Sequence, residues 1–216
     1  MPADATTDRT AASSTTQGPG SFAWMSSVMP TDAELTEALG YTVTTDGPPS
    51  VRPGRKFRNT FIGSGEVAER DCIGVVSPLE QEAYAGAPVT AVSFATEAAA
   101  TYSAAAFDSV DGAKATFERF AQQWQACDGR TVVRSFAGKP VQDRISDVQI
   151  TDAVISAVVT LDGPEGVPVV VGRALGVAHD CMVDVDVGFV DPVDQMHAAE
   201  RAVRLVEKML SRVATS

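Results

Sequence analysis

The chain has 216 residues, enough for one large domain or two small ones, and its apolar residues form the pattern of a single core. Its 17 Lys and Arg residues against 28 Asp and Glu residues give a formal net charge of −11. Such an acidic surface repels phosphate backbones and anionic lipids. We therefore expect no nucleic-acid partner and no attachment to a membrane through charge.

The N-terminal region has the composition of an unfolded segment. Residues 1–21 are rich in Thr, Ser, Ala, Gly and Pro and contain no large apolar residue after Met1, which predicts a disordered leader or tether before one domain at residues 22–216. Residues 1–17 lack the basic start and apolar run of a signal peptide, and no run approaches 18 apolar residues. The chain is expected to be cytosolic, or to be a mature region whose export signal lies outside this sequence.

Two short helices are predicted in the first half of the chain. Thr31 and Glu34 have the spacing of a capping box and open a helix at Asp32–Leu39. Ser77, followed by a proline, predicts the start of a second helix over residues 78–84. Both are too short to be stable without packing against the main body.

The densest positive cluster of this acidic chain lies in a turn-rich segment. It contains Arg52, Arg55, Lys56 and Arg58. An anion site and a solvated basic loop are the alternatives, and the solvated loop is favoured because exposed basic loops seldom have a dedicated ligand.

A long amphipathic helix is predicted from Asp108 or Ser109, either of which can cap it, to a glycine at position 129. Its large apolar residues recur at steps of three and four, which places them on one face. That stripe comprises Val110, Ala113, Phe117, Phe120, Ala121, Trp124 and Cys127. The helix is therefore expected to dock on a core through one buried seam.

The remaining pattern is mainly that of strands. Strands are predicted at residues 89–95, 100–107, 131–136, 145–150 running with a bend into 153–161, 167–177 and 181–187. The short turns between the later strands require antiparallel pairing. A last amphipathic helix is predicted from Asp191, with Pro192 in its first turn, to Val213. Together these elements predict an α+β fold: an antiparallel sheet with two long amphipathic helices on one face, plus short N-terminal helices.

Two groups of charged residues on strands are candidate sites. Arg173 shares its strand face with bulky apolar residues, so its guanidinium needs an anion, and a structural ion pair is favoured over a ligand. Asp184 and Asp186 lie two positions apart on one strand, which resembles a metal site of some glycosyltransferases. A solvated strand face is the favoured explanation of that pair.

The sequence gives little support to catalysis. No serine stands in a nucleophile elbow, and neither a phosphate-binding glycine loop nor a dinucleotide fingerprint is found, so no cofactor is expected. If the chain were an enzyme with a serine or cysteine nucleophile, His179 would be the base to test. The three cysteines, Cys72, Cys127 and Cys181, are too widely spaced for a zinc knuckle. They are buried hydrophobes, or form one disulfide with a spare thiol in an oxidising compartment.

Four groups of residues together resemble a known family. They are Asp71-Cys72-Ile-Gly-Val with Pro78 and Tyr84-Ala-Gly, Trp124-Gln-Ala-Cys127-Asp-Gly-Arg-Thr-Val, Arg173-Ala-Leu175, and Met182-Val-Asp184-Val185. In order and spacing they are similar to the PknH-type extracellular sensor domains of mycobacteria and their relatives, which occur at the outer end of a receptor serine/threonine kinase and in lipoproteins. The resemblance runs from about Met29 to Val213.

The resemblance implies a disulfide. Members of the family carry four cysteines in two bridges, and the later two positions hold Val171 or Gly172 and Val187 or Gly188 here. If the two later cysteines bond to each other in the family, they are expected to be lost together. The resemblance then implies that Cys72 pairs with Cys127, and that Cys181 is a buried residue of a strand. On the chain-entropy model such a bridge stabilises the fold by roughly 4 kcal/mol. Pairing of Cys127 with Cys181 is the rival.

The resemblance also implies a function. It indicates a non-enzymatic, extracytoplasmic sensor-like domain of the cell envelope, or a secreted one, held to the membrane only through an anchor outside this sequence. Its ligand would be an unknown small molecule or envelope component. The alternatives are an envelope hydrolase or transferase using His179 or the Asp184 and Asp186 pair, and a structural scaffold. We expect a ligand groove away from the long helix, bordered by Tyr84, Arg173 and the strand carrying Asp184.

Overall fold

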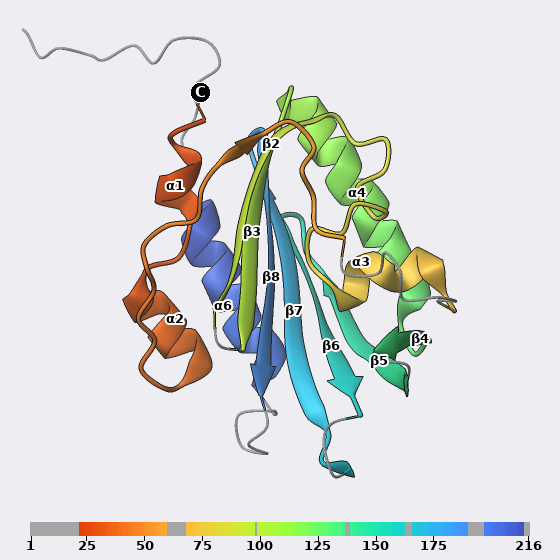
Figure 1. Ribbon diagram of the computed structural model, residues 1–216. Helices are drawn as coiled ribbons and strands as arrows, with labels where there is room; N and C mark the ends of the chain where they lie inside the picture. The colour runs from red at the N-terminus through yellow and green to blue at the C-terminus, as the bar shows by residue number, and fades with distance from the viewer. Residues whose placement is uncertain are drawn as a thin grey trace, which may run out of the picture.

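The computed structural model describes residues 22–59, 68–97, 99–136, 139–162, 166–189 and 197–213. The predicted leader at residues 1–21 lies outside these ranges, as do Asp191 and Pro192, the predicted start of the last helix. An eight-stranded antiparallel sheet forms the centre of the fold, in the order β1-β2-β3-β8-β7-β6-β5-β4 (Figure 1). The α+β class and the antiparallel sheet are confirmed. Within the described residues, no helix has the length and apolarity needed to cross a bilayer.

Most of the strands lie at the predicted segments, although the one predicted from residue 145 begins at Lys139 and the short one at Arg52–Pro53 was not predicted. They are β1 (Arg52–Pro53), β2 (Val89–Glu97), β3 (Ala100–Phe107), β4 (Thr131–Phe136), β5 (Lys139–Ile150), β6 (Val154–Leu161), β7 (Val169–Ala178) and β8 (Cys181–Phe189). The helices are α1 (Met25–Val28), α2 (Asp32–Leu39), the 3-10 turn η1 (Arg70–Cys72), α3 (Ile73–Val76), α4 (Val110–Cys127) and α6 (Ala198–Leu210).

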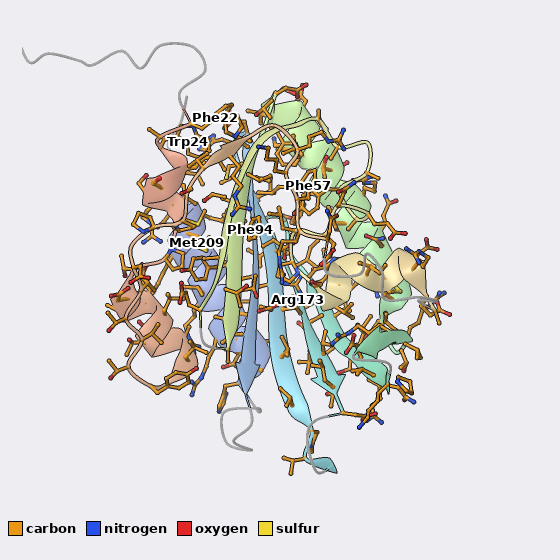
Figure 2. All side chains as sticks on the ribbon, viewed as in Figure 1. Phe22, Trp24, Phe57, Phe94, Arg173 and Met209 are labelled. Carbon is orange, nitrogen blue, oxygen red and sulfur yellow. A yellow bond between two sulfur atoms is a disulfide. The ribbon has the colours of Figure 1, made fainter. Side chains whose placement is uncertain are left out.

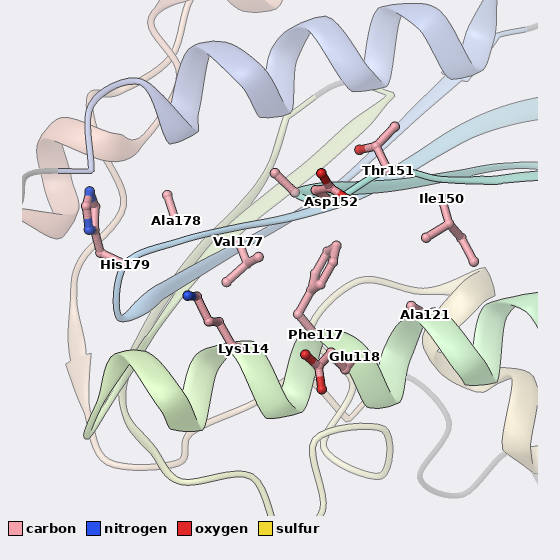
Figure 3. Close-up of a pocket in the computed structure, with 11 residues that line it drawn as sticks. Lys114, Phe117, Glu118, Ala121, Ile150, Thr151, Asp152, Val177, Ala178 and His179 are labelled. Carbon is pink, nitrogen blue, oxygen red and sulfur yellow. The ribbon is translucent and has the colours of Figure 1, made fainter.

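The two long helices lie on opposite faces of the sheet, so their predicted placement on one face is wrong. A Cβ atom added to Gly172 of β7 would lie 1.9 Å from the backbone oxygen of Ala198 in α6. The next residue along β7, Arg173, instead faces α4, with its guanidinium carbon 5.3 Å from the centre of the Trp124 ring. Since neighbouring strand residues point to opposite faces, each helix covers its own core. Figure 3 shows this arrangement, with the sheet between the two helices.

The short N-terminal helices complete the α6 face. Buried side chains of α1 and α2 pack in the same cluster as those of α6. The capping box at Thr31 and Glu34 is formed as predicted. Glu34 also pairs with Arg212 at 2.7 Å, which ties the start of α2 to the residues after α6. The α6 face is thus covered by elements from both ends of the described chain (Figure 1).

The long helix α4 has the predicted bounds, and its predicted seam packs into the core except for Val110, which is 37 % exposed. Ser109 caps it by accepting a hydrogen bond from the Gly112 N–H, and Gly129 follows it with a φ of 76°. Phe117, Phe120 and Trp124 are all buried. The seam packs against β-strands and against the segment that contains α3.

The helix predicted at residues 78–84 is absent, and a helix forms earlier, at α3. Residues 78–79 and 81–86 form turns instead. Leu79 has a φ of 55°, outside the helical region, and its N–H donates to Asp184. Arg58 and Glu80 form an isolated bridge. These tertiary contacts override the local capping signal of Ser77.

Strands β5 and β6 form an antiparallel hairpin, so the prediction of one continuous bent strand is wrong there. The turn lacks glycine and proline, the usual turn residues. Thr151 builds it with its side chain: the hydroxyl donates to the Val154 carbonyl and accepts from the Val154 N–H. The hairpin brings the turn at residues 151–153 beside the one between β7 and β8, where Ala153 accepts a hydrogen bond from the Val177 N–H.

The structure contains the disulfide between Cys72 and Cys127, with the two Cα atoms 5.7 Å apart, and leaves Cys181 free and buried. The bridge joins η1 to the end of α4. Across β7 and β8, Val171 lies opposite Gly188, and Gly172 lies opposite Val187. The two positions at which the family pattern has its second pair of cysteines are therefore cross-strand neighbours.

The cysteines predict a specific alkylation pattern. Burial raises the pKa of the Cys181 thiol, which keeps it protonated and unreactive in the folded protein. We expect iodoacetamide to label no cysteine in native protein, Cys181 alone in denatured unreduced protein, and all three after reduction, as read by peptide mass mapping. Three labelled thiols without reductant would contradict the disulfide.

Candidate functional site

A buried arginine lies at the centre of the α4 face. The Arg173 side chain extends from β7 and is fully buried. Its guanidinium donates to the carbonyls of Val75 at 2.7 Å and Gly74 at 3.1 Å, and also to the carbonyl of Val185. It forms an ion pair with Asp184 at 2.8 Å. Met209 of α6 lies on the other side of the sheet (Figure 2). The structural ion pair favoured for Arg173 is confirmed.

The second oxygen of Asp184 is also occupied. Its Oδ2 accepts from the Leu79 N–H at 2.9 Å and from the Tyr84 hydroxyl at 3.5 Å. Burial raises the pKa of Asp184, while Arg173 and the Leu79 N–H act in the opposite direction. Burial also raises the pKa of Tyr84 well above its ordinary value, so its hydroxyl remains a neutral donor. The carboxylate therefore depends on its partners to remain ionised in this position.

The two aspartates of β8 do not form a solvated strand face, so that explanation is wrong for Asp184, which is 1 % exposed. Asp186 accepts a hydrogen bond from the Thr101 N–H at 2.7 Å, and burial raises the pKa of its carboxyl group. Among the described residues, no group of three His, Cys, Asp or Glu side chains is placed to hold a metal ion. The two carboxylates thus have separate structural partners.

The structure brings together the three residues predicted to border a ligand groove. Tyr84, Arg173 and Asp184 are at most 1 % exposed, and they line none of the cavities described below. Their hydrogen bonds account for their positions without a ligand. A ligand-binding role for these three residues remains an untested prediction.

The arginines of the basic segment have structural contacts. Arg52 stacks over the Phe94 ring at 4.5 Å, and Arg55 donates to the Tyr84 carbonyl at 3.0 Å. Arg58 donates to the Pro78 carbonyl at 3.2 Å. The segment therefore fastens the chain before α3 to the α4 face.

The main concave surface beside α4 is a groove of about 570 Å³. One wall is α4 from Lys114 to Ala121, and the other consists of residues 150–153 and 177–179, at the β5–β6 and β7–β8 turns (Figure 3). We call it the α4 groove. Because α4 forms one of its walls, this groove is distinct from the one predicted away from the long helix at Tyr84, Arg173 and Asp184.

The α4 groove combines apolar and charged groups. Phe117 lies between α4 and the β5–β6 turn, and Ile150 is 41 % exposed at one end (Figure 3). Lys114 extends from α4 toward β7, and His179 lies at the opposite end from Ile150 (Figure 3). His179 has a φ of 51°, which forms the tight turn into β8. Such a mixture suits reversible binding of a small molecule.

Sequence reasoning identified His179 but missed the other groove residues. Lys114 has the helical spacing of the seam residue Phe117, three positions on, and could have been recognised as bordering it. Ile150 gave no signal, because its exposure depends on the hairpin that the sequence did not predict.

A second groove, of about 620 Å³, lies on the α6 face between that helix and strands β5 and β6. Its charged residues include Glu200 and Arg204, which lie 3.9 Å apart and partly satisfy one another. Thr151 borders both grooves. The α4 groove is the stronger candidate because no ion pair links its charged residues to one another within the described chain.

Comparison with known proteins identifies the family. The family model of the PknH-like extracellular domain matches residues 23–212. The chain belongs to the PknH-like extracellular domain family. The match covers nearly all of the described residues, including both long helices and every strand of the sheet.

Relatives of this PknH-like domain include much longer kinases. It is 27 % identical over 171 residues to the serine/threonine-protein kinase PknH of Mycobacterium bovis, covering 76 % of this chain and 28 % of the kinase. The PknH of Mycobacterium tuberculosis gives the same identity and covers 27 % of that kinase. The chain therefore spans little more than a quarter of the length of these relatives.

A solved structure has the same fold. The crystal structure of the extracellular domain of PknH from Mycobacterium tuberculosis superposes with a TM-score of 0.71 at 22 % identity, covering 87 % of this chain and 93 % of that chain. At this level of identity the likeness establishes the fold of the PknH-like domain and not its ligand.

The Arg173 network predicts an unequal response to substitution. Arg173→Met leaves a buried carboxylate and three carbonyls without their donor, so we expect a loss of about 4 kcal/mol in the free energy of unfolding. Asp184→Asn keeps one acceptor oxygen, which can serve Arg173 or the Leu79 N–H but not both, so a smaller loss of about 2 kcal/mol is expected. Urea unfolding at pH 7 measures both.

The control is Arg144→Met, which breaks an ion pair with Asp162 whose side chains are both 55 % exposed. It should cost less than about 1 kcal/mol. Arg173 lowers the pKa of Asp184 in the folded wild type, so Arg173→Met raises that pKa further above its unfolded value. The folded variant then binds protons more readily than the folded wild type, and its loss in the free energy of unfolding relative to the wild type shrinks as the pH falls from 7 to 5. A loss in the free energy of unfolding that grows as the pH falls would contradict this account.

Proposed function

We propose that this chain is an extracytoplasmic, non-enzymatic, sensor-like domain that binds a small molecule or envelope component in the α4 groove. Membership in a family of extracellular domains supports the location. The groove itself carries the binding proposal, because it joins an exposed apolar side chain to charged groups in one concavity. Attachment to a membrane would come from an anchor outside this sequence.

The groove is well suited to act as a pre-formed site. The disulfide to Cys72 holds the end of α4, and Gly112 in its first turn packs closely against Pro88. The opposite wall consists of turns joined by the hydrogen bond between Ala153 and Val177. Binding would therefore require little reordering of the backbone, which keeps its entropic cost low.

The enzyme alternative has weaker support. Asp184 and Asp186 are held by Arg173, Leu79 and Thr101, so neither is poised as a general base. Among the described lining residues of the α4 groove there is no serine or cysteine, and Thr151 donates its hydroxyl to a backbone carbonyl. His179 therefore has no activated nucleophile beside it in that lining.

Co-purification tests the binding site. Protein isolated from its own source should show a bound small molecule by native mass spectrometry. Ile150→Asp should lose it, because a charge is placed in the apolar end of the groove. Val167→Asp is the matched control, since Val167 is another exposed apolar residue, 48 % exposed, and lies outside the groove lining. A ligand retained by Ile150→Asp would remove the groove from the proposal.

Turnover assays test the non-enzymatic part. We expect esterase, glycosidase and phosphatase substrates to remain unconverted by the purified domain. We expect this because the described lining of the α4 groove has no serine or cysteine nucleophile, and because the carboxylates of Asp184 and Asp186 are hydrogen-bonded to other residues. Conversion that is reproducible and is lost in His179→Ala would establish the envelope hydrolase instead.

A further inference from the structure

We propose that the ligand of the α4 groove is a small amphiphile with a single anionic head group and an aliphatic tail. This inference rests on the proposed function and specifies its ligand class. The head, a carboxylate or a phosphate diester, would bind at Lys114 and His179, and the tail would lie along Phe117 toward Ile150. The order of side chains along the groove and the charges around them support this ligand class.

The head-group end is defined by Lys114. In the described part of the chain no carboxylate lies within ion-pair distance of its ammonium group, although Arg70, Arg130 and Lys208 each have one. Among the described residues the exposed Lys139 likewise has no such partner, so Lys114 is distinguished by its place in the groove lining. His179 borders the same end of the groove and offers a ring N–H donor (Figure 3). These two groups can bind one anionic head together.

The tail end is defined by exposed apolar surface. Ile150 is one of four large hydrophobic side chains with substantial exposure in the described residues, and it is the one that lines this groove. Phe117, Ala121 and Val177 extend the apolar lining from it toward Lys114 (Figure 3). An aliphatic chain lying there would remove Ile150 from water, which favours binding in proportion to the buried area.

The acidic residues of the groove restrict the ligand further. Glu118 and Asp152 border its middle, between the Lys114 end and Ile150 (Figure 3). They repel a second negative charge placed along the tail, so a singly anionic head at the Lys114 end is favoured over a polyanion. The acidic surface also opposes contact with an anionic bilayer, so the free amphiphile is the expected form of the ligand.

Isothermal titration with matched ten-carbon probes below their micelle concentrations tests the inference. We expect decanoate to bind, decanol to bind about tenfold more weakly, and decyltrimethylammonium to bind more weakly still. Lys114→Ala should weaken decanoate about tenfold and leave decanol unchanged, because only the head-group contact is lost. Lys139→Ala is the control, since Lys139 is an exposed lysine outside the groove lining. Phosphatidylglycerol vesicles should not bind.

Each contrary result has a definite meaning. Equal binding of decanoate and decanol, preference for the ammonium probe, or no binding of any probe would overturn the ligand class. If Lys114→Ala leaves decanoate binding unchanged, the ligand class is also overturned. Binding of the vesicles would mean that the protein recognises a lipid surface rather than a free amphiphile. None of these outcomes decides the proposed function, which is tested separately by the ligand that co-purifies and by its loss in Ile150→Asp.

Discussion

A buried guanidinium is the constraint on which the α4 face depends. Arg173 stands among bulky apolar residues of β7, where an unpartnered charge would be very costly. Its acceptors come from two directions: the β8 residues Asp184 and Val185, and the carbonyls of Gly74 and Val75. These carbonyls belong to the last turn of α3, where a helix has unpaired acceptors and a negative dipole end. The arginine therefore caps α3 and joins it to the sheet.

The same network explains why the chain around α3 folds against its local signals. Ser77 and the following proline favour a helix after residue 77, but Leu79 must donate its N–H to Asp184, so its backbone takes a left-handed conformation. The helix forms before Ser77 instead, where its final carbonyls reach Arg173. The disulfide at Cys72 fastens the start of this segment to α4. Two long-range constraints, one ionic and one covalent, therefore position a short segment with weak intrinsic helix propensity.

Much of the fold was predictable because its signals are local. The seam of α4, the capping box of α2 and the alternation of the strands follow from spacing alone, and the disulfide followed from resemblance to the family. The prediction that both long helices lie on one face of the sheet was wrong because both faces of β7 are apolar. The alternation of residues along the strand therefore did not indicate that one face is exposed to solvent. The small residues Gly172 and Gly176 were the available signal, since they allow α6 to approach the strand closely. The hairpin at Thr151 was missed because a side-chain hydroxyl makes a turn that glycine or proline usually makes.

The candidate site depends on these unpredicted features. Ile150 becomes exposed in the α4 groove only because the chain reverses at Thr151, and Lys114 faces β7 only because α4 lies on the side of the sheet opposite α6. About two helical turns separate Phe117, which lines the groove, from Trp124, which lies against Arg173. One helix thus carries both the groove wall and a contact with the buried network. A ligand that displaced α4 would have to disturb the packing around Arg173 and the disulfide beyond it, so the groove is held as a rigid site rather than one that forms on binding.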